Sequence, residues 1–211
     1  MKRKILQLFF LRGIARKQAP QHCGISGAFL FFLFMAGFSF FSPKQSYGQN
    51  PLVKQWDARF GGSDYDWLLS LQQTADGGYI LGGYSDSGIS GDKTQASQGG
   101  YDYWIVKTDA GGVKQWDARF GGSNDDYLFS LQQTADGGYI LGGYSWSGIS
   151  GDKTQASQGA NDYWIVKTDA GGVKQWDARF GGSSDEYFNA LQQTADGGYI
   201  LGGFSLSGIS G

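Results

Sequence analysis

The chain has 211 residues, with 17 basic side chains, 19 acidic side chains and one cysteine. Every acidic residue lies after Gln49 and seven basic residues precede it, so residues 49–211 carry a net charge of −9. Such a charge gives no electrostatic basis for binding nucleic acid, which requires clustered lysine and arginine. The only cysteine, Cys23, and the only histidine, His22, also precede Gln49. The remainder therefore has no disulfide, no thiolate and no zinc site of the usual type.

Residues 1–48 predict an export signal. Six basic residues and no acidic residue occupy positions 1–24, and the apolar run 28–41 follows. Ser46 and Gly48 have the small-residue spacing that a signal peptidase recognises, which places cleavage before Gln49. The apolar stretch is close to the shortest that spans a bilayer, so an uncleaved N-terminal membrane anchor is the alternative. We therefore expect a secreted or cell-surface protein, with membrane contact only through an uncleaved N-terminal segment.

The repeat domain, residues 49–211, has a period of 60 residues. Unit 53–112 recurs as unit 113–172 with seven substitutions, and unit 173–211 is a partial third copy. Repeated modules of this size bury their exposed faces against their neighbours. The sequence therefore predicts an array of similar modules stacked side by side.

Each unit predicts four short strands joined in two hairpins. The first set of four strands covers residues 68–74, 79–85, 102–108 and 113–120, the last of which lies at the start of the second unit. Both hairpin reversals end in a glycine pair, which supplies the positive φ angles of a tight turn. The third strand, 102–108, is apolar on both faces, as expected for a middle strand that is covered on each side.

These units predict an all-β fold of tandem four-stranded antiparallel blades. Units covered on both faces are typical of a β-propeller, and 36 glycines with no apolar run at helical spacing exclude helical repeats. A stacked β-sandwich or another β-array is the alternative. Eleven strands are expected after Gln49, whereas a closed ring takes about four blades. The expected fold is thus an incomplete β-propeller of two complete units plus flanking partial units.

An incomplete ring leaves strand edges and apolar faces without neighbours. Three outcomes are open: a fragment of a longer array, an oligomer that completes the ring in trans, or an open array. We expect a fragment, because Gly211 interrupts a loop that continues with Asp92 or Asp152 in the other copies. We also expect the chain to self-associate when it is expressed alone.

The strings DYWIVKTDAGGVKQWDARFGGS and LQQTADGGYILGGYSDSGISGDKT resemble the tandem repeats of large exported proteins from bacteria that use type IX secretion. Those proteins are commonly labelled only by their C-terminal sorting domain. The organisation is also similar to the broader bacterial propeller repeats of nearly the same length. The resemblance covers residues 53–211 and implies export and a propeller-like fold, but no particular activity.

The motif Thr-Ala-Asp-Gly-Gly recurs in the first hairpin of every unit. It resembles the Asp-box of sialidase-type propellers, in which the aspartate braces a hairpin away from the active site. An aspartate in a glycine-rich turn is in the first place a turn residue. The expected structural turn residues are Asp76, Gly77, Gly78, Asp136 and Asp196.

Enzyme activity is not expected. A glycosidase needs converging carboxylates, and after Gln49 the chain has a single glutamate, Glu186, beside Tyr187. Its three arginines, Arg59, Arg119 and Arg179, occupy equivalent positions and should be spread over the array. We expect each arginine to pair with a strand neighbour such as Asp57, Asp117 or Asp177. No residue is predicted to be catalytic, and a carbohydrate-active enzyme of propeller type is the alternative function.

The connection 85–101 is long for a link between adjacent strands, and such loops are often functional or ordered by a ligand. Asp86, Asp92 and Asp152 are candidate calcium ligands because calcium prefers hard oxygen donors. Their spacing matches no EF-hand or glycine-rich calcium repeat, and a self-packed surface loop is the alternative. The prediction is therefore no cofactor, with calcium as the alternative.

Differences between the units cluster before and within the first strand and just after the second, which places them at one end of an antiparallel sheet. The candidate binding residues there are Tyr65, Trp67, Tyr127, Trp146 and Tyr187. One hypothesis is a recognition surface with aromatic anchors; drift at tolerant loop positions is the other. The predicted function is a non-enzymatic interaction or adhesion module that binds a protein or a glycan.

Overall fold

The computed structural model describes residues 6–13 and 52–208, which form twelve β-strands and no helix. Strands β1 (Leu6–Gly13) and β2 (Leu52–Phe60) form a two-stranded sheet. β1 falls within the predicted export signal, whereas the apolar run 28–41 and the cleavage site lie outside the described residues. In the described part of the chain no helix has the length and apolar character needed to cross a membrane.

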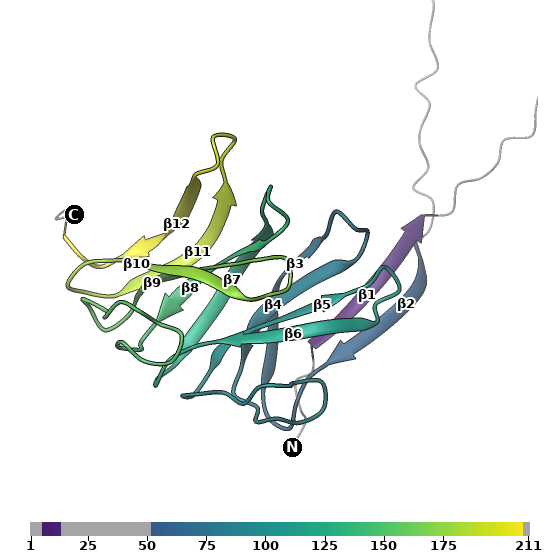
Figure 1. The fold of residues 1–211 in the computed structure, drawn as a ribbon, viewed down its shortest axis with the longest axis horizontal. Helices are drawn as coiled ribbons and strands as arrows, with labels where there is room; N and C mark the ends of the chain where they lie inside the picture. The colour runs from purple at the N-terminus through teal and green to yellow at the C-terminus, as the bar shows by residue number, and fades with distance from the viewer. Residues whose placement is uncertain (1–5, 14–51, 209–211) are drawn as a thin grey trace, which may run out of the picture. The chain divides into compact units, whose positions relative to one another are not determined.

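The repeat domain forms two four-stranded sheets and one two-stranded sheet (Figure 1). The first sheet contains β3 (Asp66–Gln73), β4 (Tyr79–Ser85), β5 (Asp102–Thr108) and β6 (Lys114–Phe120). The second sheet contains β7 (Asp126–Gln133), β8 (Tyr139–Ser145), β9 (Asp162–Thr168) and β10 (Lys174–Phe180). The third sheet contains β11 (Glu186–Gln193) and β12 (Tyr199–Ser205).

Neighbouring strands in these sheets are antiparallel and follow one another in chain order. This confirms the prediction of four antiparallel strands in each complete unit and of eleven strands after Gln49. β3 begins at Asp66, two residues before the predicted start, because Asp66 is still in register with Ser85. β5 is buried along its whole length, as expected for a strand covered on both faces.

The sheets pack face to face, and we call each interface a seam. In the first seam, Leu128 and Leu131 of β7 lie against Gly82 of β4, where a Cβ atom would come within 2.3 Å of Leu131 Cδ2. In the second seam, Phe188 and Leu191 lie against Gly142, the equivalent glycine. Each sheet therefore offers a slot at one glycine, and the next sheet fills it with two large apolar side chains.

Side chains also link the first strands of successive sheets by hydrogen bonds. The backbone N–H of Leu131 donates to Ser70 Oγ (3.0 Å), and that of Gln133 donates to Gln72 Oε1 (2.6 Å). The N–H of Ala75 donates in the opposite direction to Gln133 Oε1 (2.8 Å). These bonds satisfy backbone donors on the edge of β7 and in the turn after β3, and among the described strands neither β3 nor β7 has a second pairing partner.

Each sheet has two different ends. The turn end carries the tight reversals 74–78, 109–113, 134–138, 169–173 and 194–198. The loop end carries the links 61–65, 86–101, 121–125, 146–161, 181–185 and 206–208. At the turn end Gly77 and Gly112 have φ angles of 84° and 81°, which a residue with a side chain rarely adopts. The predicted glycine-pair hairpins therefore reverse the chain at one end only, and the variable segments gather at the other.

Candidate functional site

The sequence differences between the units lie at the loop end and in the adjoining strand residues, and extend along the first strand as far as Ala190, which replaces Ser70 and Ser130. The turn-end segments 74–78, 134–138 and 194–198 are identical, as are 109–113 and 169–173. The predicted binding residues lie in the variable region. Two further differences that sequence analysis passed over, Gly100 against Ala160 and Tyr101 against Asn161, lie there too.

A cavity of about 500 Å³ opens at the loop end, and we call it the loop-end groove. Its lining residues are Gly100, Ser123, Asn124, Asp125, Trp146, Ala160 and Asp185. All three units contribute to it, because Gly100 belongs to the first unit and Asp185 to the third. Trp146 is 48% exposed and is the only one of the five predicted binding residues that lines this groove.

The backbone that carries Trp146 is the same in every unit. The N–H of Trp146 donates to Asp125 O (3.0 Å), and the N–H groups of Asp86 and Leu206 make the equivalent bond in their own units. The same backbone position therefore carries an aspartate in the first unit, a tryptophan in the second and a leucine in the third. Substitution at this position changes the exposed surface and leaves the supporting hydrogen bond unchanged.

Asp125 and Asn124 hold the wall of the groove in place. Asp125 Oδ1 accepts the N–H of Tyr101 (2.9 Å), and its Oδ2 accepts the hydroxyl of Tyr127 (3.0 Å). Asn124 Nδ2 donates to Trp146 O (3.1 Å). Burial and the neighbouring Asp125 carboxylate both raise the pKa of Tyr127, so its hydroxyl stays protonated and acts as a donor. The groove is thus braced on one side before any ligand arrives.

A row of aromatic rings runs across the sheets behind the variable residues. Tyr84 and Tyr127 meet across the first seam with ring centroids 4.8 Å apart, and Tyr144 and Tyr187 meet across the second at 5.6 Å. Trp67 packs at one end of the row against Tyr84, at 6.0 Å. Trp67 and Tyr127 are therefore half-buried packing residues. Of the remaining predicted binding residues, Tyr65 is 43% exposed and Tyr187 is 37% exposed, and neither lines the groove.

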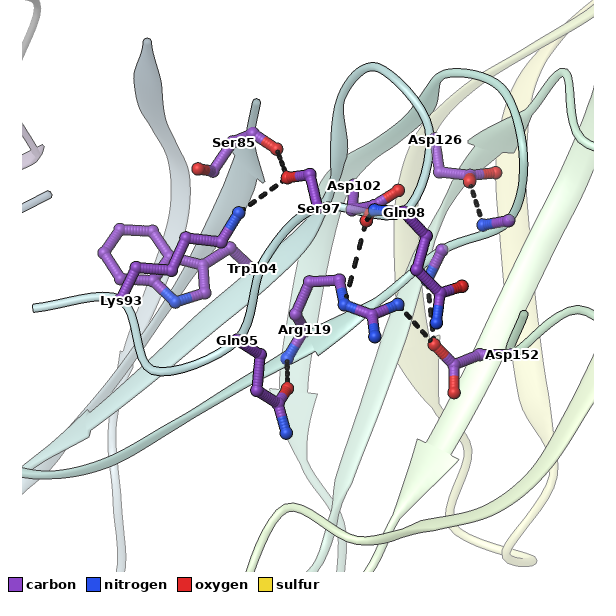
Figure 2. Close-up of polar contacts among 12 residues, drawn as sticks. Ser85, Lys93, Gln95, Ser97, Gln98, Asp102, Trp104, Arg119, Asp126 and Asp152 are labelled. Atoms are coloured by element: carbon purple, nitrogen blue, oxygen red, sulfur yellow. Dashed lines mark hydrogen bonds and ion pairs between the residues drawn. The ribbon is translucent and has the colours of Figure 1, made fainter. Parts of the chain in front are cut away.

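The long loop 86–101 is held by a buried lysine (Figure 2). Lys93 Nζ donates to Ser87 O (2.8 Å) and to Ser97 Oγ (2.6 Å), and Ser97 Oγ donates in turn to Ser85 O (2.7 Å). Burial lowers the pKa of Lys93 to about 8. The loop therefore packs on itself around an ammonium group, an arrangement that Lys153 repeats in the second unit.

The arginines pair differently from the sequence prediction. Arg119 Nη1 donates to Asp152 Oδ2 (2.8 Å), and its Nε lies 3.7 Å from Asp102 Oδ2 (Figure 2). The prediction that Arg119 pairs with Asp117 is wrong, because the carboxylate oxygens of Asp117 interact with Trp104 Nε1 (3.0 Å) and Lys114 Nζ (2.7 Å). Arg119 thus ties the first sheet to the loop of the second unit across the seam.

Two buried aspartates of successive sheets, Asp102 and Asp126, interact electrostatically at the loop end. Burial raises the pKa of Asp102 to about 6, and burial likewise raises the pKa of Asp126 to about 6. Asp102 Oδ1 has no hydrogen-bond partner in the part of the chain that is described. In the second seam Glu186 replaces Asp126, and burial together with the neighbouring Glu186 carboxyl group raises the pKa of Asp162. Both seams therefore favour an extra bound proton at the loop end.

The carboxylates of the three predicted calcium ligands accept hydrogen bonds from backbone N–H groups. Asp92 Oδ2 accepts the N–H of Gly61 (3.1 Å), Asp86 Oδ1 accepts that of Tyr65 (2.8 Å), and Asp152 Oδ2 accepts that of Gly121 (3.2 Å). Within residues 6–13 and 52–208 no three histidine, cysteine, aspartate or glutamate side chains form a group that could hold a metal ion. Calcium binding by these aspartates stays a prediction.

At the turn end, the repeated aspartates brace their hairpins. Asp76 Oδ1 accepts from Thr74 Oγ1 (2.5 Å) and from the N–H of Gly78 (3.0 Å), and Asp76 Oδ2 lies 2.8 Å from Lys107 Nζ. The hydrogen bond from Lys107, followed by that from Thr74, lowers the pKa of Asp76 to about 2. Asp136 makes the same contacts with Thr134 and Lys167, and Asp196 is bonded to Thr194 and Gly198.

Neither the protein-family models nor the curated proteins compared with this chain match it. The chemistry of the loop-end groove therefore carries the functional argument. An exposed indole ring can pack against the apolar face of a ligand, while the amide of Asn124 and the carboxylate of Asp185 can exchange hydrogen bonds with hydroxyl groups. This combination fits a neutral polyhydroxylated ligand better than an anion, because the groove carries two aspartates and no basic residue.

Proposed function

We propose that this protein is an exported, non-enzymatic interaction module that binds a glycan in the loop-end groove beside Trp146. One observation carries the proposal: the units differ only around the end of the sheets that holds the groove, while the turn end repeats without change. Export is supported by the basic, acid-free N-terminal segment and the apolar run that follows it.

A sugar ring fits the chemistry of this groove. Its C–H face packs on an indole ring, and its hydroxyl groups pair with amide and carboxylate oxygens. Trp146 supplies the ring at 48% exposure, and Asn124 and Asp185 supply the polar partners. The bracing of Asp125 by Tyr101 and Tyr127 reduces the ordering that ligand binding would otherwise require.

We also propose that the sheets are blades of an incomplete β-propeller. In support, the first strands β3, β7 and β11 contact one another in series, and each sheet packs its face on the next. Successive blades of a propeller are arranged in this way around a central axis.

The test is binding of the purified chain to an array of defined oligosaccharides. We expect binding that is lost on Trp146→Leu and retained on Ile149→Ala, which removes a 70% exposed apolar side chain from the same loop. Leucine is a suitable replacement because Leu206 occupies this position in the third unit. No oligosaccharide bound by the wild-type chain, or equal binding by Trp146→Leu, would reject the proposal.

One observation favours glycoside hydrolysis as a second candidate function. Asp125 and Asp185, from successive units, line the same groove, and a glycosidase needs two converging carboxylates. Both oxygens of Asp125 already accept hydrogen bonds from the protein, which favours binding over catalysis. Release of reducing sugar from a bound oligosaccharide, abolished by Asp185→Asn, would establish hydrolysis. Binding with no sugar released would leave the interaction module as the function.

A further inference from the structure

The third sheet exposes a face that its counterparts bury. Ile200 is 62% exposed, whereas the equivalent Ile80 and Ile140 are fully buried in the two seams. A Cβ atom placed on Gly202 would meet no atom within 4 Å, although the same position at Gly82 is filled by the next sheet. The third sheet thus carries an open slot of the kind that forms each seam, and we call it the slot face.

The first sheet carries the complementary side chains on its other face, which β2 covers in part. Leu71 is 54% exposed, whereas its equivalent Leu131 is 6% exposed and fills the slot at Gly82. Leu68 is the equivalent of Leu128, the second side chain in that slot. Leu68 is half-buried against a cluster that includes Phe60 of β2, so this pair of leucines is open at Leu71, and we call it the leucine face.

We propose that a second copy of this chain docks its leucine face on the slot face of the first copy, head to tail. Leu68 and Leu71 of one copy would lie over Gly202 of the other, as Leu128 and Leu131 lie over Gly82. Such docking would continue an existing interface, because the same seam forms twice within one chain from nearly the same residues. A contact between two different faces is heterologous, so each copy offers one face of each kind.

Polar groups that cross the seam are available on both faces. Gln192 Oε1 can accept the N–H of Gln73 from the second copy, as Gln72 Oε1 accepts that of Gln133 (2.6 Å). Gln73 Oε1 can accept the N–H of Ala195, as Gln133 Oε1 accepts that of Ala75 (2.8 Å). Position 190 differs, since Ala190 replaces the serine whose hydroxyl accepts the N–H of Leu131 or Leu191 in the existing seams. The intermolecular seam therefore lacks one of three hydrogen bonds and is weaker than the seams inside the chain.

The experiment measures the molar mass of the full chain by size-exclusion chromatography with light scattering, for the wild type and two charge variants. Leu71→Asp disables the leucine face and Ile200→Asp disables the slot face. Both residues are exposed, so neither change disturbs a packed core, and circular dichroism confirms that each variant is folded. The control is Ile89→Asp, which charges a 72% exposed residue in a loop outside both faces.

Head-to-tail docking predicts a specific pattern. The wild type and Ile89→Asp form species larger than a monomer, while Leu71→Asp alone and Ile200→Asp alone are monomers. An equal mixture of the two variants forms a 1:1 dimer and nothing larger, because only one intact leucine face can meet one intact slot face. Monomeric wild type, association of either single variant, or a mixture that stays monomeric would overturn the proposal.

A variant that is expected to strengthen self-association complements these tests, because misfolding would not produce that result. Ala190→Ser restores the hydroxyl that accepts a backbone N–H in the other seams. We expect it to tighten self-association by about 2- to 10-fold, the range for one added hydrogen bond. An unchanged or weaker association would contradict the proposed register of the docked sheets.

Discussion

The two ends of the sheets differ in how much their residues vary between units and in which contacts hold them. At the turn end, the same residues recur in every unit, and each hairpin is closed by an aspartate that bonds within its own turn. At the loop end, several residues change from unit to unit, and the contacts of Arg119 and Asp125 reach across a seam. A constant set of turns can therefore carry a changing surface, provided that the backbone of the loops is held by contacts of its own.

The two ends also differ in their electrostatics. The turn-end carboxylates of Asp76 and Asp136 are 58% exposed, and bonded donors lower the pKa of each to about 2. The loop-end carboxylates of Asp102 and Asp126 are buried, and burial raises the pKa of each to about 6. As the pH falls, Asp102 and Asp126 at the loop end are therefore protonated before Asp76 and Asp136 at the turn end.

The largest expected effect concerns the turn end. Gly138→Ala would place a Cβ atom 2.2 Å from the backbone oxygen of Thr168, so we expect a loss of about 2 to 3 kcal/mol in the free energy of unfolding. The matched control is Gly198→Ala in the third unit, where the nearest atom is 3.0 Å away in the side chain of Thr194. Urea denaturation of both variants measures the difference. Equal losses would show that the end of β9 does not pack against the turn 134–138.

The carboxyl groups of the two ends should affect the free energy of unfolding in different pH ranges. The pKa of about 6 for Asp102 and Asp126 lies above the ordinary 3.8, so between pH 4 and 6 the folded chain keeps protons that the unfolded chain has lost. Stability should therefore fall as the pH rises through this window, by about 1 to 3 kcal/mol. Asp126→Asn should reduce the slope by about half, as measured by urea denaturation at several pH values.

Below pH 4 the turn-end carboxylates should produce the opposite dependence of stability on pH. The pKa of about 2 for Asp76 and Asp136 lies below the ordinary value, so stability should decline as the pH falls from 4 towards 2. Asp136→Asn should weaken this acid branch and leave the branch between pH 4 and 6 unchanged. Loss of both branches in one variant would contradict the assignment of each branch to one end of the sheets.

A smaller effect isolates backbone conformation. Gly137 has a φ angle of 84° and open space around its Cα, so Gly137→Ala introduces strain without a clash. We expect a loss of about 1 kcal/mol in the free energy of unfolding. Gly148→Ala, in an exposed loop-end position that is also open, is the control and should change little. A cost as large as that of Gly138→Ala would mean that the turn is packed more tightly than described.

The smallest expected effect on stability belongs to the loop end. Trp146→Leu should change the free energy of unfolding by less than about 0.5 kcal/mol, because the indole is half exposed and the supporting bond is made by the backbone. Thermal unfolding of this variant beside the wild type checks the prediction. A large loss would identify Trp146 as a packing residue and not as part of a binding surface.

Local signals in the sequence were sufficient to predict the strands and hairpins. The alternation of 102–108 and the glycine pairs gave strand bounds that agree with the structure to within two residues. Contacts between units were not predictable in the same way, since a repeat places the same residue at every equivalent site and any of them is a candidate partner. The pairing of Arg119 with Asp152 and the slot at Gly82 are of this kind. The groove was anticipated only through Trp146, because its other walls are short polar loop residues without a distinctive pattern.

The most direct measurement exchanges the variable surface while keeping the constant one. A chain in which the second unit carries the first unit's residue at positions 124, 125, 146 and 160 retains every turn-end residue and replaces four of the seven residues that line the groove. Our account predicts that its binding profile on the oligosaccharide array changes from that of the wild type, while its midpoint of urea unfolding stays within the range set by Trp146→Leu. An unchanged binding profile, or no binding by either chain, would contradict the account.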